Sequence, residues 1–194
     1  MTQLKFIFTG TPGAGKTTAI AAISDFPPVS TDAFATDDLM DVKEHTTVAM
    51  DFGELTLESG ERIGLYGTPG QERFRHMWEI LIKGGLGLII LVDNSRPNPL
   101  ADLKIYLDNF RQFINQTGAV IGITRADIDT RVGLQDYQEL LDKEGFVLPI
   151  FEADARSKED VLLLLDMLMA VVEMNQPNMN IEDDNEQHDS LLSF

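Results

Sequence analysis

The chain has 194 residues, with 15 Lys and Arg against 32 Asp and Glu, and it contains no Cys. That length suits one domain of roughly 100–200 residues with a full core. The formal charge of −17 argues against non-specific binding to nucleic acid or anionic membranes, because such binding depends on Lys and Arg. The lack of Cys excludes disulfides, thiolate zinc sites, cysteine nucleophiles and prenyl or palmitoyl anchors, so we expect no direct membrane anchor.

A β-prone run at residues 4–9 leads into a Gly-rich turn, and residues 16–24 then have the composition of a helix. This order predicts a strand, a loop and a helix. Residues 25–45 follow with two adjacent prolines, several Ser, Thr and Asp, and no convincing hydrophobic period. We expect them to form an irregular surface segment, since long loops of this kind are usually functional or disordered.

Two strand-like runs at residues 48–57 and 62–66 are joined by polar turn residues, and they predict an antiparallel hairpin. The rest of the chain alternates between predicted strands and predicted helices. Strands are expected at residues 86–93, 119–124 and 148–153, and helices at residues 100–115, 134–143 and 158–174. Such alternation is typical of a three-layer α/β fold, in which helices cover both faces of a mostly parallel sheet with one antiparallel edge hairpin.

Residues 175–194 differ in character, because they hold five acidic residues and no Lys or Arg. This composition cannot bury enough apolar surface to offset its ordering entropy. We therefore expect a disordered acidic tail after a domain at residues 1–174, with a short docking motif at Ile181 and residues 191–194 as the alternative. The N-terminus lacks the pattern of a signal peptide, and no apolar run reaches the roughly 20 residues of a bilayer span.

The sequence GTPGAGKT at residues 10–17 satisfies the phosphate-binding pattern G-x-x-x-x-G-K-[ST], and it lies between a predicted strand and a predicted helix, as that pattern requires. Gly10, Gly13 and Gly15 let the backbone curl so that successive N–H groups converge on phosphate oxygens. Lys16 places a positive charge on the β- and γ-phosphates, and the hydroxyl of Thr17 can ligate Mg²⁺. We therefore expect a site for a nucleoside triphosphate.

Three further motifs follow in chain order: TVAMDF at residues 47–52, GTPGQERFR at residues 67–75 and TRAD at residues 124–127. Over residues 4–174 the chain resembles the small Ras-like GTPases, which have a P-loop GTPase fold. It is most similar to bacterial members, namely the mutual-gliding polarity switches and the conservon GTPases, whose partners are Roadblock/LC7 proteins. The resemblance implies a cytoplasmic, monomeric switch that binds GTP or GDP with Mg²⁺, and that pairs with a Roadblock-type regulator and downstream effectors.

The resemblance also implies roles for single residues. Thr47 senses Mg²⁺ and the γ-phosphate from the first switch loop, with Thr46 as the alternative if the loop is displaced by one residue. Gly70 offers its N–H to the γ-phosphate, and Gln71 orients the attacking water. Gln71 and Lys16 are therefore the expected catalytic residues, because phosphoryl transfer asks the protein for positioning and charge stabilisation.

Asp127 is expected to accept hydrogen bonds from guanine N1 and N2, a pair of donors that adenine lacks. Arg125 stands where the family usually has Lys, and Ala155 offers its N–H to guanine O6. The expected magnesium ligands are Thr17 and Thr47. The full set expected to contact the nucleotide is Gly10, Thr11, Pro12, Gly13, Ala14, Gly15, Lys16, Thr17, Thr18, Thr47, Gly70, Thr124, Arg125, Asp127, Ala155 and Arg156.

The largest departure from the family pattern is Gly67, which stands where an aspartate usually holds Mg²⁺ through water. Either Thr17, Thr47, the phosphates and water suffice, or another carboxylate replaces the missing one, with Asp51 the nearest candidate. Pro12 is a second departure, because it lies near the γ-phosphate position and removes an N–H donor.

No arginine finger can be identified. Arg73 and Arg75 either turn inward in a partner complex or, as we favour, face solvent or a partner. Trp78 lies either on a partner surface or in the core. Two rival functions stay open beside the hydrolytic switch, a guanine-nucleotide scaffold without useful hydrolysis and a P-loop ATPase or kinase, although Asp127 and Gln71 argue against the second.

Overall fold

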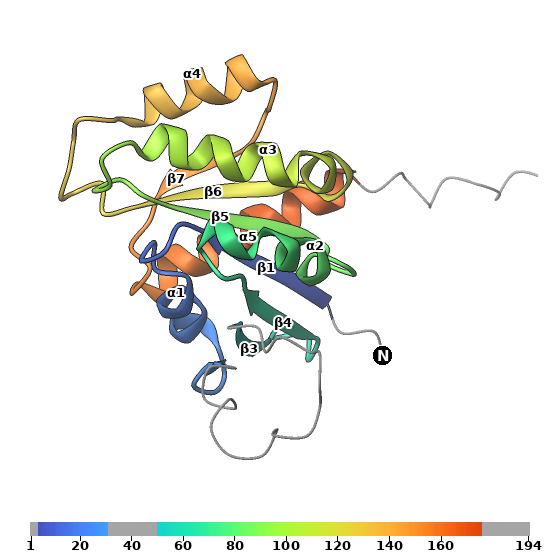
Figure 1. Cartoon of the computed structure of the whole chain (residues 1–194). Helices are drawn as coiled ribbons and strands as arrows, with labels where there is room; N and C mark the ends of the chain where they lie inside the picture. The colour runs from blue at the N-terminus through green and yellow to red at the C-terminus, as the bar shows by residue number, and fades with distance from the viewer. Residues whose placement is uncertain (1–3, 31–49, 176–194) are drawn as a thin grey trace, which may run out of the picture.

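A computed structural model describes residues 4–30 and 50–175, which form a seven-stranded sheet with helices on both faces (Figure 1). The strand order is β2-β3-β4-β1-β5-β6-β7. From β4 to β7 every neighbouring pair is parallel, whereas β2–β3 and β3–β4 are antiparallel. The bounds are β1 Leu4–Gly10, β2 Val29–Ser30, β3 Asp51–Thr56, β4 Arg62–Gly67, β5 Gly87–Asp93, β6 Ala119–Thr124 and β7 Ile150–Glu152. The predicted mixed α/β sheet with its antiparallel hairpin is confirmed.

The two faces of the sheet carry separate hydrophobic clusters, because side chains alternate along a strand. In β1, Phe6 and Phe8 point into one cluster and Ile7 points into the other. The first cluster lies beneath α1 and α5, and the second lies beneath α2, α3 and α4 (Figure 1). The helix bounds are α1 Lys16–Ile23, α2 Arg75–Leu81, α3 Pro99–Thr117, α4 Leu134–Glu144 and α5 Lys158–Asn175.

The parallel strands place the predicted motifs at one edge of the sheet. Strands β1, β4, β5 and β6 all end at the same edge, because parallel neighbours share their direction. The loops that follow them carry residues 10–17, 67–75 and 124–127. In open α/β sheets this carboxyl edge is where ligands bind.

Three local features differ from the sequence prediction. Val29 and Ser30 form the short strand β2 within the segment expected to be irregular. A 3₁₀ helix at Glu72–Phe74 and the helix α2 occupy a stretch for which no element was predicted. Strand β7 covers three residues instead of six. Thr46, Thr47 and the predicted tail after residue 175 lie outside the described residues.

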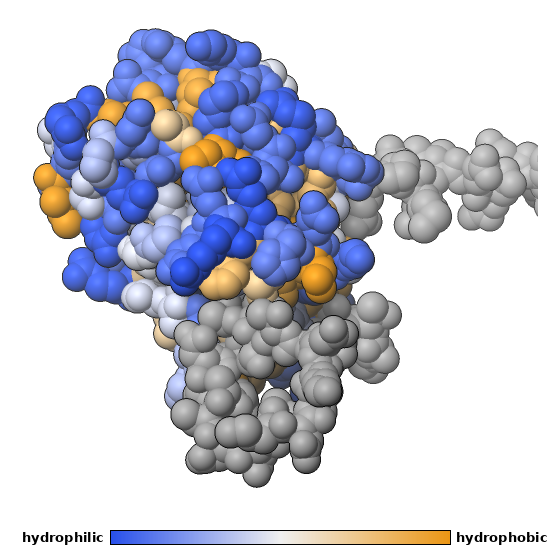
Figure 2. Space-filling model, in the orientation of Figure 1, coloured by the Kyte–Doolittle hydropathy of each residue, from blue (hydrophilic) through white to orange (hydrophobic). Residues whose placement is uncertain are grey.

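The face seen in Figure 2 is mostly hydrophilic, and its apolar residues are scattered in small groups. Asp, Glu, Lys and Arg together make up 24% of the chain. Within residues 4–30 and 50–175, no helix is both long enough and apolar enough to cross a membrane.

Candidate functional site

The phosphate-binding loop, or P-loop, at residues 10–17 has the backbone that its glycines allow. Gly10, Gly13 and Gly15 all have positive φ, at 134°, 79° and 97°. A side chain at Gly10 would meet the carbonyl oxygen of Leu91 at 2.0 Å, so only glycine fits beside β5. Gly15 also caps the start of α1 in the left-handed conformation. The loop therefore runs directly into a helix N-terminus, which is a favourable place for phosphate.

The ammonium group of Lys16 is bonded to the backbone of this loop. Its Nζ donates to the carbonyl oxygens of Gly10 at 2.9 Å and Thr11 at 2.8 Å, and the residue is only 8% exposed. Burial lowers the pKa of Lys16 to about 8, and the nearby charge of Asp51 opposes that shift. The ammonium group is thus held against the backbone of the P-loop.

Asp51 takes the place left by the missing aspartate at Gly67. The two residues are direct partners in the β3–β4 ladder. A side chain added at Gly67 would lie 3.2 Å from Cβ and 3.3 Å from Oδ2 of Asp51, so the Asp51 carboxylate fills the space that an aspartate at Gly67 would enter. The hydroxyl of Thr17 donates to Oδ2 of Asp51. The Asp51 carboxylate therefore lies beside Thr17 and opposite Gly67.

The start of the switch II segment, defined as residues 68–84, lies against the P-loop. A side chain added at Gly70 would come within 2.6 Å of Pro12 N and 2.7 Å of Lys16 Nζ. Gln71 follows at the head of the 3₁₀ helix. A pocket of about 200 Å³, which we call the switch pocket, is lined by Thr11, Pro12, Gly70, Gln71, Glu72, Arg96, Asp102, Ile105 and Tyr106. The two predicted γ-phosphate residues thus lie beside the P-loop.

The structure decides the two alternatives for Trp78. The residue is 2% exposed, and so is its neighbour Met77. Trp78 therefore belongs to the core, and the partner-surface alternative is wrong for this side chain. Ile80, at 62% exposure, is the apolar residue that α2 presents to solvent.

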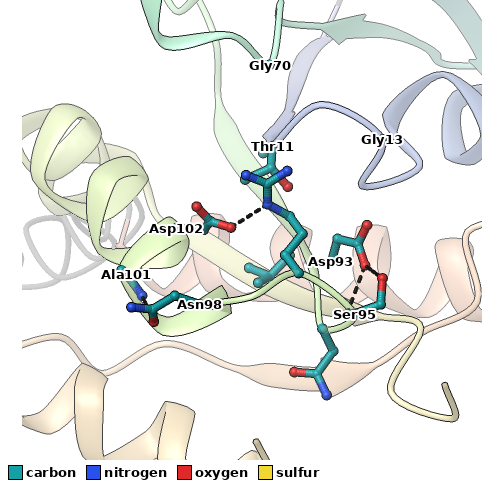
Figure 3. A network of polar contacts seen from close by, with 12 residues as sticks. Thr11, Gly13, Gly70, Asp93, Ser95, Asn98, Ala101 and Asp102 are labelled. Carbon is teal, nitrogen blue, oxygen red and sulfur yellow. Dashed lines mark hydrogen bonds and ion pairs between the residues drawn. The ribbon is translucent and has the colours of Figure 1, made fainter. Parts of the chain in front are cut away.

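Arginines near the switch pocket are held by local partners. Arg75 pairs with Glu72 at 2.6 Å, and Arg73 lies over the ring of Phe74 at 4.8 Å. Both arrangements keep these side chains at the surface, as we favoured. Arg96, after β5, pairs with Asp102 of α3 at 2.5 Å. Figure 3 shows this ion pair at Asp102 with two further contacts near it, the bond from the N–H of Ala101 to Asn98 at the start of α3 and the bond from Ser95 to Asp93.

On the other side of the P-loop, the end of β6 is tied to it by two side chains. The hydroxyl of Thr124 donates to the carbonyl oxygen of Ala14 at 3.1 Å. Arg125, which has a φ of 56°, donates from Nη1 to the carbonyl oxygen of Gly13 at 2.8 Å and also pairs with Asp93. Arg125 therefore connects the P-loop backbone to the end of β5.

A second pocket of about 580 Å³, which we call the base pocket, extends from this region. The predicted residues that line it are Ala14, Gly15, Thr18, Thr124, Arg125, Asp127, Ala155 and Arg156. Asp154 holds Arg156 through two side-chain bonds, from Nε at 2.9 Å and Nη2 at 2.7 Å, and this pairing lowers the pKa of Asp154 to about 2. Arg156 is therefore fixed at the rim with its side chain 80% exposed.

All the predicted nucleotide residues inside the described ranges gather around the P-loop. Thr11, Pro12 and Gly70 line the switch pocket, a second group lines the base pocket, and the P-loop residues Gly10, Gly13, Lys16 and Thr17 line neither. Thr47 lies outside the described residues. Among residues 4–30 and 50–175, no cluster of three or more His, Cys, Asp or Glu could hold a metal ion.

Sequence reasoning missed three supporting residues. Asp93 anchors Arg125, and Trp78 and Tyr106 donate to carbonyl oxygens of the switch II segment. Asp93 directly follows a buried strand, a signal that could have indicated it. No sequence signal connects Tyr106 to Gly70, which lies 36 positions away.

Residues 8–187 match a protein family described as "Conserved hypothetical ATP binding protein". The chain is 27% identical over 142 residues to the Ras-related protein SEC4 of Candida albicans (strain WO-1), which covers 70% of this chain and 67% of that protein. It is 27% identical over 165 residues to the Ras-related protein RABE1e of Arabidopsis thaliana, covering 81% and 69%. It is 24% identical over 186 residues to the Ras-related protein Rab-27A of Rattus norvegicus, covering 87% and 78%.

Proposed function

The chain belongs to the family of conserved hypothetical ATP binding proteins, and we propose that it is a GTP-binding molecular switch that hydrolyses GTP to GDP and phosphate. In this proposal the switch loops, at residues 30–47 and 68–84, change with the nucleotide and control partner binding. The similarity to Ras-related proteins supports this reading.

The observation that carries the proposal is the position of Gly70. It lies against Lys16 and Pro12 at one end of the P-loop, while Asp127 lines a pocket at the other end. A triphosphate along the loop would then meet Gly70 with its γ-phosphate and Asp127 with its base. A switch needs a segment that contacts the γ-phosphate, because such a segment can distinguish GTP from GDP.

Base preference is tested by titrating the purified protein with fluorescent GTP, GDP and ATP. We expect guanine nucleotides to bind more tightly than ATP, because one carboxylate at Asp127 can accept from both N1–H and the N2 amino group of guanine. The Asp127→Ala variant should lose that preference and keep its affinity for the phosphates. Equal affinity for ATP and GTP in the wild type would contradict the proposal.

A second candidate is a P-loop ATPase, which is favoured by the description of the family. An adenine base would present an acceptor at N1 and a donor at N6 to the base pocket, and Asp127 would then meet an acceptor. The titration described above distinguishes the GTP-binding switch from the ATPase, because an ATPase would bind ATP more tightly than GTP.

The residues of the P-loop fit a magnesium ion. Mg²⁺ is usually held in such sites by one or two protein oxygens together with substrate phosphates and waters. The hydroxyl of Thr17 and the carboxylate of Asp51, which contact one another, supply oxygens of the right kind, and we propose them as its holders together with Thr47. When bound, the ion neutralises charge on the β- and γ-phosphates.

Hydrolysis is assigned to Gln71 and Lys16. Gln71 orients the attacking water, and Lys16 stabilises charge on the phosphates, so intrinsic turnover is expected to be slow without a partner. The scaffold alternative predicts no more phosphate release in the wild type than in the Gln71→Leu variant. Single-turnover phosphate release from the two proteins, each with GTP already bound, separates the alternatives.

The partners in this proposal are a Roadblock/LC7-type regulator and downstream effectors, and the setting is the cytoplasm of a bacterial cell. The support for these partners is the motif pattern around Thr47, Asp51 and residues 67–75. Co-purification of a Roadblock-type protein with the GTP-bound form, and not with the GDP-bound form, tests this part of the proposal.

A further inference from the structure

Two consecutive carbonyl groups at the start of the switch II segment are held by buried aromatic side chains. Trp78 donates from Nε1 to the carbonyl oxygen of Pro69 at 2.7 Å. Tyr106 donates from its hydroxyl to the carbonyl oxygen of Gly70 at 2.8 Å. Trp78 belongs to α2 and Tyr106 to α3, so side chains from two helices hold neighbouring peptide groups.

The side chains that make these bonds are rigidly packed. The ring centroid of Trp78 lies 5.1 Å from that of Tyr106 and 5.4 Å from that of Phe110, and Trp78 and Tyr106 are each 2% exposed. Burial raises the pKa of the Tyr106 hydroxyl, which therefore stays protonated and able to donate. The two donors thus have fixed positions relative to α3 and the sheet.

Fixing these carbonyl groups also fixes two N–H groups. In a trans peptide the C=O and N–H bonds point in opposite directions, and the described residues contain no cis peptide bond. Holding the carbonyl of Pro69 towards Trp78 therefore turns the N–H of Gly70 away from the rings of Trp78, Tyr106 and Phe110, which we call the aromatic cluster. Holding the carbonyl of Gly70 does the same for the N–H of Gln71. Pro12 N and Lys16 Nζ lie within 2.7 Å of a Cβ built on Gly70, so the P-loop borders these peptide groups.

We propose that Trp78 and Tyr106 are positioning residues for γ-phosphate recognition, because they orient the peptide groups that carry the N–H of Gly70 and the N–H of Gln71. This inference rests on the proposed function, and it adds residues that act through the peptide groups of Gly70 and Gln71. It also makes the aromatic cluster beneath the switch II segment part of the machinery that distinguishes the triphosphate from the diphosphate.

The test is the Tyr106→Phe variant, which removes one hydroxyl and keeps the aromatic ring. We would measure its affinity for GDP and for a non-hydrolysable GTP analogue. The loss of an orienting neutral hydrogen bond should weaken binding of the analogue roughly three- to tenfold, while GDP affinity changes less than about twofold. Single-turnover hydrolysis from the GTP-bound protein should slow as well, because the peptide group leading into Gln71 loses its anchor.

The matched control is Tyr137→Phe. Tyr137 is also buried, and its hydroxyl donates at 2.6 Å to Asn94, away from the switch II segment. This variant loses a comparable bond and should keep the wild-type ratio of the two affinities. Trp78 is the single tryptophan of the chain, so its emission reports directly on the cluster and should change when the analogue replaces GDP in the wild type.

Four outcomes would overturn the inference. Wild-type affinities for both nucleotides in Tyr106→Phe would show that the bond to Gly70 does not orient the γ-phosphate contacts. An equal loss for GDP and the analogue, or the same ratio change in Tyr137→Phe, would indicate general destabilisation. Failure of the wild type to bind guanine nucleotides would instead overturn the proposed function and this inference with it.

Discussion

Asp51 of β3, and not a residue of β4, supplies the carboxylate beside Thr17. Asp51 and Gly67 face one another across the β3–β4 ladder, and Asp51 is bonded to Thr17. We expect Asp51→Asn to raise the Mg²⁺ concentration needed for tight nucleotide retention by roughly ten- to 100-fold, the range found when metal-site partners are removed. The measurement is nucleotide release at a series of Mg²⁺ concentrations.

Asp25→Asn is the control for this prediction. Asp25 also holds β3, because its carboxylate accepts from the backbone N–H of Thr56 at 2.8 Å, and within the described residues that carboxylate has no hydrogen bond to Thr17 or the P-loop. Its variant should keep the wild-type Mg²⁺ dependence. In the exchange variant with Asp51→Gly and Gly67→Asp, the carboxylate returns to β4, and we expect partial recovery relative to Asp51→Asn. No recovery would show that the strand position of the carboxylate matters more than its presence.

The pKa of Lys16 predicts a pH dependence of nucleotide binding. Burial lowers this pKa to about 8, so the neutral amine becomes populated as the pH rises through that value. Phosphate favours the charged ammonium, and binding above about pH 8 must therefore take up a proton. Affinity should then fall as the pH rises, by at most about tenfold per unit.

Calorimetry near pH 9 in two buffers of different ionisation enthalpy measures that proton uptake. Lys16→Met provides the control, because it has no amine to titrate. The prediction fails if the wild type takes up no proton near pH 9, or if the same uptake persists in the variant.

At the scale of elements, the loop after β6 is attached to the P-loop by Arg125. Its guanidinium bridges the carbonyl oxygen of Gly13 and the carboxylate of Asp93, which ends β5. Arg125→Ala should weaken GDP and GTP analogue equally, by roughly tenfold, because a charge-assisted bond that positions the P-loop is lost. Titration with both nucleotides measures this effect.

Arg131→Ala is the matched control within the same connection. Arg131 pairs with Asp129 at 2.5 Å and is 67% exposed in its side chain, and it does not line either pocket. Its loss should leave both affinities unchanged. A change in the ratio of the two affinities in Arg125→Ala would assign that residue to the γ-phosphate end and contradict its bridging role.

The long elements could be predicted from the sequence because their patterns are local. Strand β5 is a continuous apolar run, and α3 has an amphipathic period with Asn98 and Pro99 at its start. Strand β2 was missed because two residues show no period, and its pairing with Phe52 and Asp51 of β3 depends on tertiary structure. Helix α2 was missed because its first turn is polar and exposed, while its buried face has only Met77 and Trp78.

The residues of the candidate site also differ in whether the sequence alone could identify them. Residues that act through a short motif, such as Lys16 and Asp127, could be assigned from their neighbours in sequence. The residues that act through a distant partner could not, since the bonds from Tyr106 to Gly70 and from Arg125 to Asp93 join positions more than thirty residues apart. Strand alternation alone left the direction of the Asp51 side chain undetermined, and its pairing with Gly67 and its bond to Thr17 define that direction.

At the scale of the whole molecule, the P-loop lies between the switch pocket and the base pocket, and it is connected to both halves of the sheet. Lys16 and Gly70 meet on one side, and Thr124 and Arg125 hold Ala14 and Gly13 on the other. A nucleotide that engages both sides would stabilise β1, β4, β5 and β6 together. Binding should therefore appear as a change in global stability and not only in local order.

Thermal unfolding with and without nucleotide measures this stabilisation. GDP at about 100 times its Kd should add about 2.7 kcal/mol, which corresponds to a rise in Tm of roughly 5–10 °C for a domain of this size. ADP at the same concentration should give a clearly smaller rise, and Asp127→Ala should reduce the GDP shift while its own Tm stays near that of the wild type, because Asp127 is exposed. An ADP shift as large as the GDP shift would mean that the base pocket does not select guanine and would contradict the GTP-binding switch, whereas a larger ADP shift would indicate the adenine preference suggested by the family description.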